Sequence, residues 1–262
     1  MNFFDCFMYN NEELLLDLRL NILSKYVKKF ILVESAVDHQ GNKKKNFFQI
    51  DKFNKFKDKI IHIKIDHFPK KFSSSWEREN FQRNYISKST KDLLDDDYII
   101  ISDVDEIPNF ESLNNFEKYK FTAFEQLNFC YKFNMKNMTY PKWYGSKLCK
   151  KKYLKSPQWL RNLKVREFSF FQFYKTKWNI IRNGGWHFSF LMKPSEIKNK
   201  IKSFAHDEFN KKEFLEIDQI KQKIKLGKDL FNRDQKYIRV NIDNKFPKQI
   251  FDNMDKYKEW IV

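Results

Sequence analysis

The sequence predicts an α/β protein with a mostly parallel central sheet and helices on both faces of that sheet. Short apolar runs alternate with helix-like stretches through the first half of the chain, which is the order of a parallel sheet with crossover helices. The run at 98–101 is unbroken, as expected of a strand buried on both faces. Glu34 and Asp103 follow two of these runs, and ligands of such sheets bind at the carboxyl ends of the strands. A binding site is therefore expected at this edge of the sheet.

The first half of the chain contains the clearest secondary-structure patterns. Strands are expected at 3–8, 30–33, 60–65 and 98–101. A helix is expected at 12–26, where leucine and isoleucine recur at helical spacing, with Asn11 as its N-cap. Arg19 is one of the polar residues between these apolar positions. A second helix, with a dense polar face, is expected at 76–91.

The second half of the chain, from about residue 109 onward, is less regular and is rich in tyrosine and tryptophan. Three more strands are expected to extend the same sheet, and two helices are expected after them: strands at 121–130, 168–174 and 187–192, and helices at 194–204 and 213–226. The chain has no linker-like segment and no internal repeat. We therefore expect one domain over residues 1–262, with two parts that meet near residue 108.

The composition is that of a folded and strongly basic protein. The 262 residues include 51 lysines and arginines against 34 acidic residues, which gives a formal net charge of +17. Aromatic residues make up 18% of the chain, and this content excludes a disordered chain. The basic residues are spread along the sequence, and no nucleic-acid-binding motif accompanies them. Such a charge favours polyanionic neighbours, namely nucleotide diphosphates, acidic glycans or an anionic membrane surface.

The cysteines and the N-terminus limit the class of protein further. Cys6, Cys130 and Cys149 are widely spaced and form no CxxC motif, which argues against a thiolate zinc site and a disulfide scaffold. Three free, buried thiols are expected instead. The N-terminus lacks the basic and apolar regions of a signal peptide, and no apolar run is long enough to span a bilayer. The sequence thus predicts a cytoplasmic protein without a transmembrane segment.

An acidic cluster follows the strand expected at 98–101. Asp103, Asp105 and Glu106 are three carboxylates within four residues, and they would repel one another unless a cation lay between them. Hard cations such as Mg²⁺ and Mn²⁺ prefer carboxylate oxygens and often share them with substrate phosphates. At extended spacing Asp103 and Asp105 point to the same side, so one can hold the ion while the other reaches a ribose or a metal-bound water. The alternative is a solvated acidic turn. Pro108 is expected to end the strand.

Six segments of the chain are similar, in the same order, to segments of glycosyltransferase family seventeen. This family contains the bisecting beta-1,4-N-acetylglucosaminyltransferases and their bacterial, fungal and viral relatives. The segments are Phe4–Phe7, Phe30–Ser35, Trp76–Glu79 with Phe81–Asn84, Ile101–Pro108, Gly184–Ser189 and Lys202–Glu208. Their order and the string DVDEIP at 103–108 carry the resemblance, which covers roughly residues 1–240.

The resemblance implies a fold, a donor, a cofactor and a stereochemical course. The fold implied is GT-A, with a Rossmann-like central sheet. The implied donor is a UDP-sugar, at family level UDP-N-acetylglucosamine, and the implied cofactor is Mn²⁺ or Mg²⁺. The reaction would invert the anomeric carbon. Residues 1–108 would then bind the nucleotide sugar, and the aromatic-rich residues 109–262 would bind a glycan acceptor.

Four residues are candidates for contact with the donor, among them Asp103 of the acidic cluster. Glu34 could accept hydrogen bonds from uridine or ribose, or it could cap the next turn. Arg83 suits a diphosphate because its planar guanidinium donates hydrogen bonds in pairs. The alternative for Arg83 is an ion pair with Glu79, which lies one helical turn away. His206 could act at the donor or the acceptor, or it could cap a helix.

Metal ligation is predicted for Asp105, with Asp103 and His187 as further candidates. His187 follows two glycines, which permit close approach of the backbone, and a neutral histidine is a good metal ligand. The alternative for His187 is a hydrogen-bonded residue of an aromatic core.

An inverting transferase needs a general base that takes the proton of the acceptor hydroxyl, and a carboxylate is the usual choice. The candidates are Glu208 and Glu167, with Glu106 as a third. Four aromatic residues could stack on acceptor sugars or could belong to the core: Trp143, Tyr144, Trp159 and Trp178.

The sequence therefore predicts a metal-dependent inverting glycosyltransferase that moves a sugar onto a glycan hydroxyl. One alternative is a basic nucleic-acid-binding protein, whose binding would fall steeply with salt, but it leaves the ordered segments unexplained. A second is a metal-dependent phosphohydrolase, which would release phosphate without a sugar acceptor. A third, an inactive glycan-binding relative, requires the loss of a key carboxylate, yet all three of the cluster are present.

Overall fold

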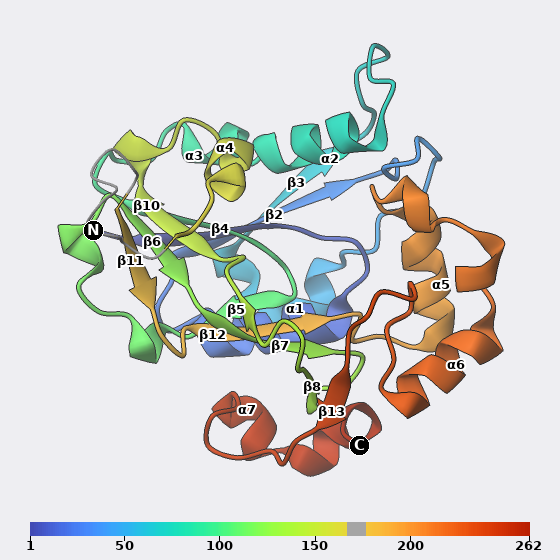
Figure 1. The fold of residues 1–262 in the computed structure, drawn as a ribbon. Coiled ribbons are helices and arrows are strands. Elements are labelled where there is room, and N and C mark those ends of the chain that lie inside the picture. The colour runs from blue at the N-terminus through green and yellow to red at the C-terminus, as the bar shows by residue number, and fades with distance from the viewer. Residues whose placement is uncertain (167–176) are drawn as a thin grey trace.

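Two β-sheets organise the chain in the computed structural model, which describes residues 1–166 and 177–262 (Figure 1). The larger sheet has seven strands in the order β11-β6-β10-β4-β1-β2-β3. Its strands are β1 (Phe3–Met8), β2 (Lys29–Ser35), β3 (Ile60–Ile65), β4 (Tyr98–Asp103), β6 (Phe121–Phe124), β10 (Lys147–Lys150) and β11 (Trp178–Ile181). β10 runs antiparallel to its neighbours β4 and β6, and the other neighbouring pairs are parallel. The prediction of an α/β protein with a mostly parallel sheet is confirmed.

The smaller sheet is formed mainly by the second half of the chain, in the order β13-β8-β7-β12-β5, with β9 paired to β7. Its strands are β5 (Glu106–Pro108), β7 (Gln126–Cys130), β8 (Met135–Asn137), β9 (Lys142–Trp143), β12 (Gly185–Ser189) and β13 (Tyr237–Arg239). The expectation that the later strands extend the first sheet is right for β6 but wrong for β7 and β12. The strand expected at 168–174 lies outside the described residues.

The change of sheet between β6 and β7 occurs at Glu125. Its backbone N–H donates to the carbonyl of Ile181, and its own carbonyl accepts from the N–H of Gly184 at 2.7 Å. A side chain at Gly184 would lie 2.6 Å from the carbonyl oxygen of Ile181, so only glycine permits this close approach. Apolar periodicity predicts the strands on either side of this corner but not the corner itself, because the backbone partners come from a distant segment.

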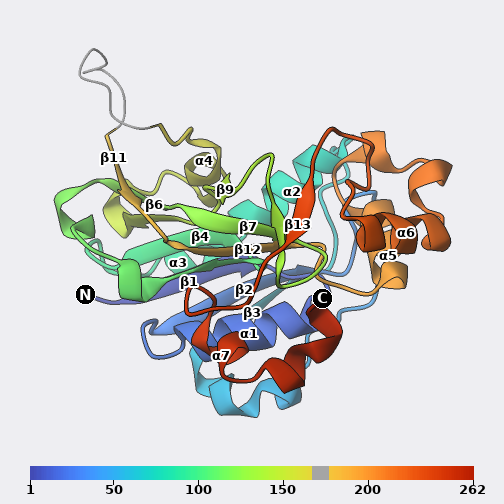
Figure 2. The same ribbon diagram turned by 60° about the horizontal axis from the view of Figure 1, so that its bottom comes forward.

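Helices cover both faces of the larger sheet, as predicted (Figures 1 and 2). α1 (Glu13–Leu23) and α7 (Lys248–Phe251) lie on one face, together with the smaller sheet. α2 (Ser75–Asn84), α3 (Ser87–Thr90) and α4 (Pro157–Asn162) lie on the other. Side chains alternate between these layers along each strand, so that Phe7 packs with α1 while Cys6 packs on the α4 side.

The helices α5 (Pro194–Ser203) and α6 (Ile217–Leu226) lie beyond the carboxyl ends of β2 and β3 (Figure 1). They pack on a separate apolar cluster that includes Ile197, Ile201 and Ile220. α5 thereby faces the sheet edge at which the sequence predicts a binding site.

Several element ends differ from the sequence-based expectations. Asn11 is not the N-cap of α1, because its φ of +70° is left-handed and the N-cap position is taken by Glu12. The helix expected at 76–91 is divided into α2 and α3. Pro108 does not end β4, which stops at Asp103; Pro108 is the last residue of β5 and pairs with Gly185.

Two further expectations concern the cysteines and the membrane. The three cysteines are free and buried, as predicted. In residues 1–166 and 177–262, every helix is too short or too polar to cross a bilayer.

Candidate functional site

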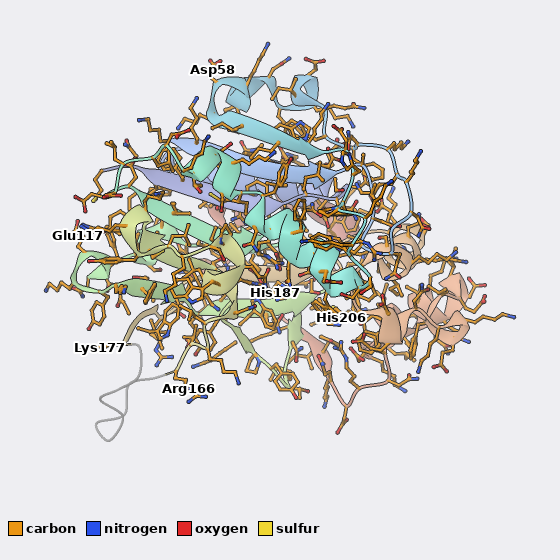
Figure 3. All side chains as sticks on the ribbon, turned by 90° about the horizontal axis from the view of Figure 1, so that it is seen from above. Asp58, Glu117, Arg166, Lys177, His187 and His206 are labelled. Atoms are coloured by element: carbon orange, nitrogen blue, oxygen red, sulfur yellow. The ribbon has the colours of Figure 1, made fainter. Side chains whose placement is uncertain are left out.

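A cavity of about 430 Å³ lies at the carboxyl ends of β1 and β4, where the sequence predicts a binding site. Its wall is formed by the strand ends, by α2, by α5 and by parts of the smaller sheet. The predicted site residues that line it are Arg83, Asp103, Asp105, Glu106, His187 and His206. Figure 3 labels both histidines, and the ring of His206 contacts Trp76 of α2 with 4.7 Å between the ring centroids. The tertiary structure thus brings together residues from distant parts of the sequence.

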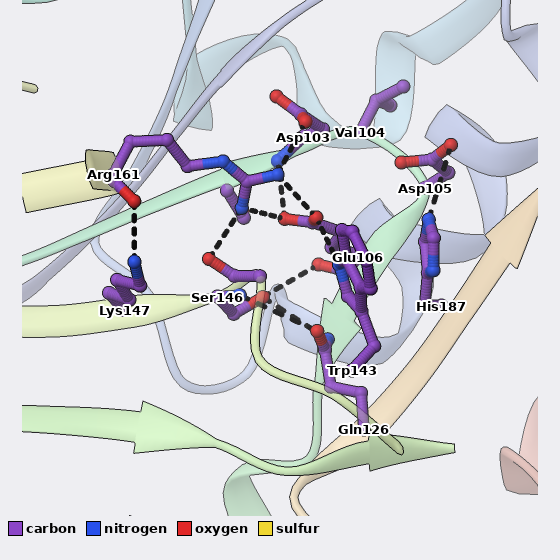
Figure 4. A network of polar contacts seen from close by, with 12 residues as sticks. Asp103, Val104, Asp105, Glu106, Gln126, Trp143, Ser146, Lys147, Arg161 and His187 are labelled. Carbon is purple, nitrogen blue, oxygen red and sulfur yellow. Dashed lines mark hydrogen bonds and ion pairs between the residues drawn. The ribbon is translucent and has the colours of Figure 1, made fainter. Parts of the chain in front are cut away.

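Asp103 and Glu106 are held by arginines, and Figure 4 shows the contacts of one of them, Arg161. Arg161 donates to Asp103 at 2.8 Å and to both carboxylate oxygens of Glu106 at 2.7 Å. Arg83 also donates to Asp103, at 3.1 Å. Burial by itself would raise the pKa of Asp103, but the charges of Arg161 and Arg83 outweigh it and hold this pKa well below its usual range. Two of the three carboxylates are therefore neutralised by the protein itself.

Glu106 has further contacts that keep it in place. Its carboxylate accepts hydrogen bonds from the indole N–H of Trp143 at 2.6 Å and from the backbone N–H of Asp103 at 2.9 Å. A side chain at Gly145 would collide with this carboxylate, at 2.0 Å from its oxygen. Glu106 is only 1% exposed, so its role in this arrangement is to hold the acidic loop.

Asp105 has a different environment from the other two carboxylates. The basic groups nearest to its carboxylate are the Nε2 atom of His187 at 3.9 Å and the Nζ atom of Lys200 at 4.0 Å. Within the described part of the chain, its carboxylate accepts no hydrogen bond. Burial is the main cause that raises the pKa of Asp105 above its ordinary value. Asp105 is therefore the carboxylate of the cluster with unused oxygen lone pairs at the cavity.

His187 is oriented by two neighbours. Its Nδ1 atom lies 3.1 Å from Oδ1 of Asn128, and its ring stacks on Trp143 with 4.7 Å between the ring centroids. The amide nitrogen of Asn128 donates to the carbonyl of Tyr140, which assigns the amide oxygen to the side facing His187. Nδ1 then carries the hydrogen, and Nε2 presents its lone pair toward Asp105.

Arg19 extends from α1 to the acidic loop and holds its backbone. The sequence pattern predicted only that Arg19 is one of the polar residues of this helix. It is fully buried and forms an ion pair with Asp5 at 2.6 Å. The same guanidinium donates to the backbone carbonyls of Asp103 and Glu106 and to the hydroxyl of Ser102. A signal was available in the sequence, because Asp5 within an apolar strand requires a buried cation.

Two predicted site residues do not line the cavity, and a third is not among the described residues. Glu34 is fully buried outside the cavity lining and accepts hydrogen bonds from the backbone N–H groups of Phe47 and Phe48. Glu208 is exposed and accepts from Nδ1 of His206 at 2.8 Å. Glu167 lies outside the described residues. The roles of these residues stay predictions.

The four candidate aromatic residues separate into two groups. Trp178 is 6% exposed and packs against Phe121, as does Trp159, so both belong to the core. The hydroxyl of Tyr144 donates to Glu125. Trp143 lines the cavity and is 37% exposed, so it is the member of the set that can contact a sugar.

The residues present at the cavity can supply part of a metal site. Among the described residues, no three His, Cys, Asp or Glu side chains converge as ligands. Asp105 and His187 nevertheless point one carboxylate and one imidazole nitrogen toward each other. This pair fits an ion that takes its other ligands from substrate phosphates and water.

The sequence matches the model of a known protein family. A family model for glycosyltransferase family 17 matches residues 1–238. A comparison with curated proteins found no match. The matched region contains β1 to β13 almost completely and all of the cavity residues described above.

Proposed function

The chain belongs to glycosyltransferase family 17, and we propose that it transfers N-acetylglucosamine from UDP-N-acetylglucosamine to a glycan hydroxyl in this cavity. One observation carries the proposal. Asp105, the carboxylate left unpaired by the arginines, faces Nε2 of His187 at the carboxyl end of β4. The seven-strand order, with β10 as its antiparallel member, supports the GT-A-like arrangement expected from the resemblance.

The proposed reaction is a displacement at the anomeric carbon. The acceptor hydroxyl oxygen bonds to this carbon on one side while the bond to the diphosphate breaks on the other, and UDP leaves with the electron pair. Negative charge therefore grows on the diphosphate, and its stabilisation is the largest task of the site. Arg161 and Arg83 serve this task indirectly, because they hold Asp103 and Glu106 and leave Asp105 available.

Asp105 and His187 would hold a divalent cation. When bound, such an ion supplies positive charge to the departing diphosphate. A set of one carboxylate and one imidazole suits Mn²⁺ better than Mg²⁺, because Mg²⁺ favours oxygen ligands and keeps its waters. Asn128 and Trp143 would orient His187 for this role.

For the general base we propose the pair of His206 and Glu208. His206 lines the cavity, and Glu208 accepts a hydrogen bond from its Nδ1 atom. Nε2 of His206 would take the proton of the acceptor hydroxyl, and Glu208 would stabilise the imidazolium that forms. The edge-to-face contact with Trp76, at 4.7 Å between ring centroids, supports the ring in this position.

The two parts of the chain would bind different substrates. Residues up to 108 provide Tyr9, Asp38 and Gln82 to the cavity wall, which we assign to the nucleotide sugar. Later residues provide Tyr140 and Trp143, whose rings would stack on an acceptor sugar, together with neutral hydrogen-bonding groups such as Asn137 and Gln235. The cytoplasmic location expected from the sequence stays a prediction.

The test is a transfer assay with UDP-N-acetylglucosamine, Mn²⁺ and a panel of glycan acceptors. The chain should release UDP and extend an acceptor, and Asp105→Asn should abolish both. Asp66→Asn is the matched control, because Asp66 is exposed and lies outside the cavity lining. Release of inorganic phosphate without an acceptor would instead support a phosphohydrolase, and no turnover with any nucleotide sugar would overturn the proposal.

A further inference from the structure

Lys200 brings a positive charge to the acidic loop from the C-terminal part of the chain. It lies on α5, and its Nζ atom is 3.3 Å from Oε1 of Glu12 and 4.0 Å from Oδ2 of Asp105. Its side chain is 23% exposed and lines the cavity. Asp105 therefore has an ammonium group of the protein beside it, as well as the imidazole of His187.

The position of Lys200 is held by the surroundings of α5. The apolar side of the helix is anchored by Ile197 and Ile201, which are fully buried. Its last residue, Ser203, accepts a backbone hydrogen bond from His39 at 3.2 Å. Just beyond the helix, the hydroxyl of Ser75 donates to the carbonyl of Ala205. These contacts join the end of α5 to the loop after β2 and to α2. The backbone that carries Lys200 is therefore held in place.

The charges around Lys200 explain what it can do. Glu12 and Asp105 are each 8% exposed, and no arginine contacts either of them among the described residues. The arginines of the site are occupied, since Arg83 and Arg161 bind Asp103 and Glu106. The ammonium of Lys200 lies between the carboxylates of Glu12 and Asp105, and it is within hydrogen-bond distance of Glu12 alone of these two. A compact ammonium with three donors can bind a phosphate oxygen as well as the carboxylates.

We propose that Lys200 is a catalytic residue that binds the diphosphate of the donor and that Glu12 positions it. The inference rests on the proposed function and extends it, because it gives the site a source of positive charge that needs no metal. As the bond between the sugar and the diphosphate breaks, the electron pair passes to the β-phosphate oxygen, and the ammonium of Lys200 stabilises this charge. The acceptor proton leaves through the base, so Lys200 gives up no proton.

The position of Lys200 beside Asp105 should also affect the binding of a metal ion. Lys200 and a divalent cation would both face Asp105, and their like charges repel each other. Removing the ammonium should therefore strengthen the binding of Mn²⁺ alone while it weakens the binding of UDP without metal. A purely structural role for Lys200 would not move these two affinities in opposite directions.

The experiment measures binding by calorimetry for the wild-type chain and for Lys200→Met, Lys200→Arg and Lys198→Met. The probes are UDP, uridine and Mn²⁺, with UDP measured both with and without Mn²⁺. Lys198 is the control, because it lies on α5 with similar partial exposure but outside the cavity lining. In metal-free buffer, Lys200→Met should weaken UDP binding about tenfold or more, as expected for the loss of a charged hydrogen bond. Uridine binding should not change, and Lys200→Arg should retain part of the UDP affinity.

Each outcome is informative. Equal UDP affinity in Lys200→Met and the wild type would overturn this inference and leave the donor site in place. No binding of UDP by the wild type, with or without Mn²⁺, would overturn the proposed function and this inference with it. The double variant Glu12→Gln with Lys200→Met removes the unpaired carboxylate and guards against misfolding. It should show the same loss of UDP binding, and a return to wild-type affinity would contradict a direct contact.

Discussion

Asp5 and Arg19 form an ion pair that is completely withdrawn from solvent, with 2.6 Å between Oδ1 and Nη2. The carboxylate lies on β1, and the guanidinium extends from α1 to the backbone of the loop that follows β4. The pair thereby connects the centre of the sheet to the acidic loop of the candidate active site. The pair should therefore contribute to the free energy of unfolding of the whole chain and should fix the position of that loop.

Removing one partner of this pair should be strongly destabilising. Asp5→Ala leaves the Arg19 charge buried without its carboxylate, and we expect a loss of about 3–5 kcal/mol in the free energy of unfolding. Urea denaturation followed by circular dichroism measures this loss. The control is Glu13→Ala, which breaks the half-exposed contact with Lys52 and should cost less than about 1 kcal/mol. Similar losses in both variants would contradict the special role of the buried pair.

Substitutions of Asp105 and Glu106 should have different effects, the first on catalysis and the second on stability. Asp105→Asn should reduce transfer by at least about a hundredfold with little change in the melting temperature, because no hydrogen bond of the described structure depends on this carboxylate. Glu106→Gln should instead lower the free energy of unfolding by several kcal/mol, on the order of 3, because it breaks a buried contact with Arg161.

Steady-state kinetics and thermal unfolding on the same preparations test this division. An Asp105→Asn protein that unfolds like Glu106→Gln would indicate that Asp105 is a structural residue. A Glu106→Gln protein of normal stability would show that the acidic loop does not depend on its arginine contacts.

Asn128 should act on metal binding through His187. Asn128→Ala removes the acceptor that keeps the hydrogen on Nδ1, so Nε2 no longer presents its lone pair uniformly. We expect Mn²⁺ affinity to fall about 10–100-fold, the usual effect of losing an outer partner of a ligand histidine. Nitrogen NMR shifts of His187 in the metal-free protein report the tautomer directly. Asn179→Ala is the control, since Asn179 lies on β11 outside the cavity lining. An unchanged tautomer in Asn128→Ala would refute this role.

Lys147 should make stability depend on pH above neutrality. It is 5% exposed and donates to the carbonyl oxygens of Arg161 and Leu163, and burial, with the charge of Arg161, lowers its pKa from 10.5 to about 8. Between about pH 8 and 10.5 the unfolded chain holds this proton more firmly than the folded chain, so the contribution of Lys147 to stability rises with pH. Below about pH 8 both states are protonated, and the cost of the buried charge is complete and constant.

The measurement compares the wild type with Lys147→Met, because other groups titrate in the same range. The difference in unfolding free energy, wild type minus variant, should be flat from pH 6 to about 8 and should then rise by no more than about 3 kcal/mol toward pH 10.5. Urea titrations at four pH values give this difference. A difference that stays constant or falls above pH 8 would show that the pKa of Lys147 is not lowered.

Local pattern was sufficient for much of the fold. The strands expected at 3–8 and 60–65 coincide with β1 and β3. They could be predicted because an apolar run involves neighbouring residues only. The acidic cluster was located for the same reason, since a strand end and a run of carboxylates are both local features. The division into two sheets was not predicted, because a single residue separates β6 from β7 and residues 121–130 therefore resemble one strand. The corner at Glu125 is set by backbone hydrogen bonds to Ile181 and Gly184.

The sequence by itself determined the α/β class, the place of the acidic loop and the resemblance to the family, because these depend on the order and periodicity of neighbouring residues. The tertiary structure alone decided which carboxylate is available. Arg161 lies 58 residues from Asp103 and Arg19 lies 84 residues from the same position, so neither contact leaves a local pattern. Buried charges must find partners wherever the folded chain brings them, and this requirement, which acts across long stretches of sequence, leaves Asp105 beside His187 and Lys200.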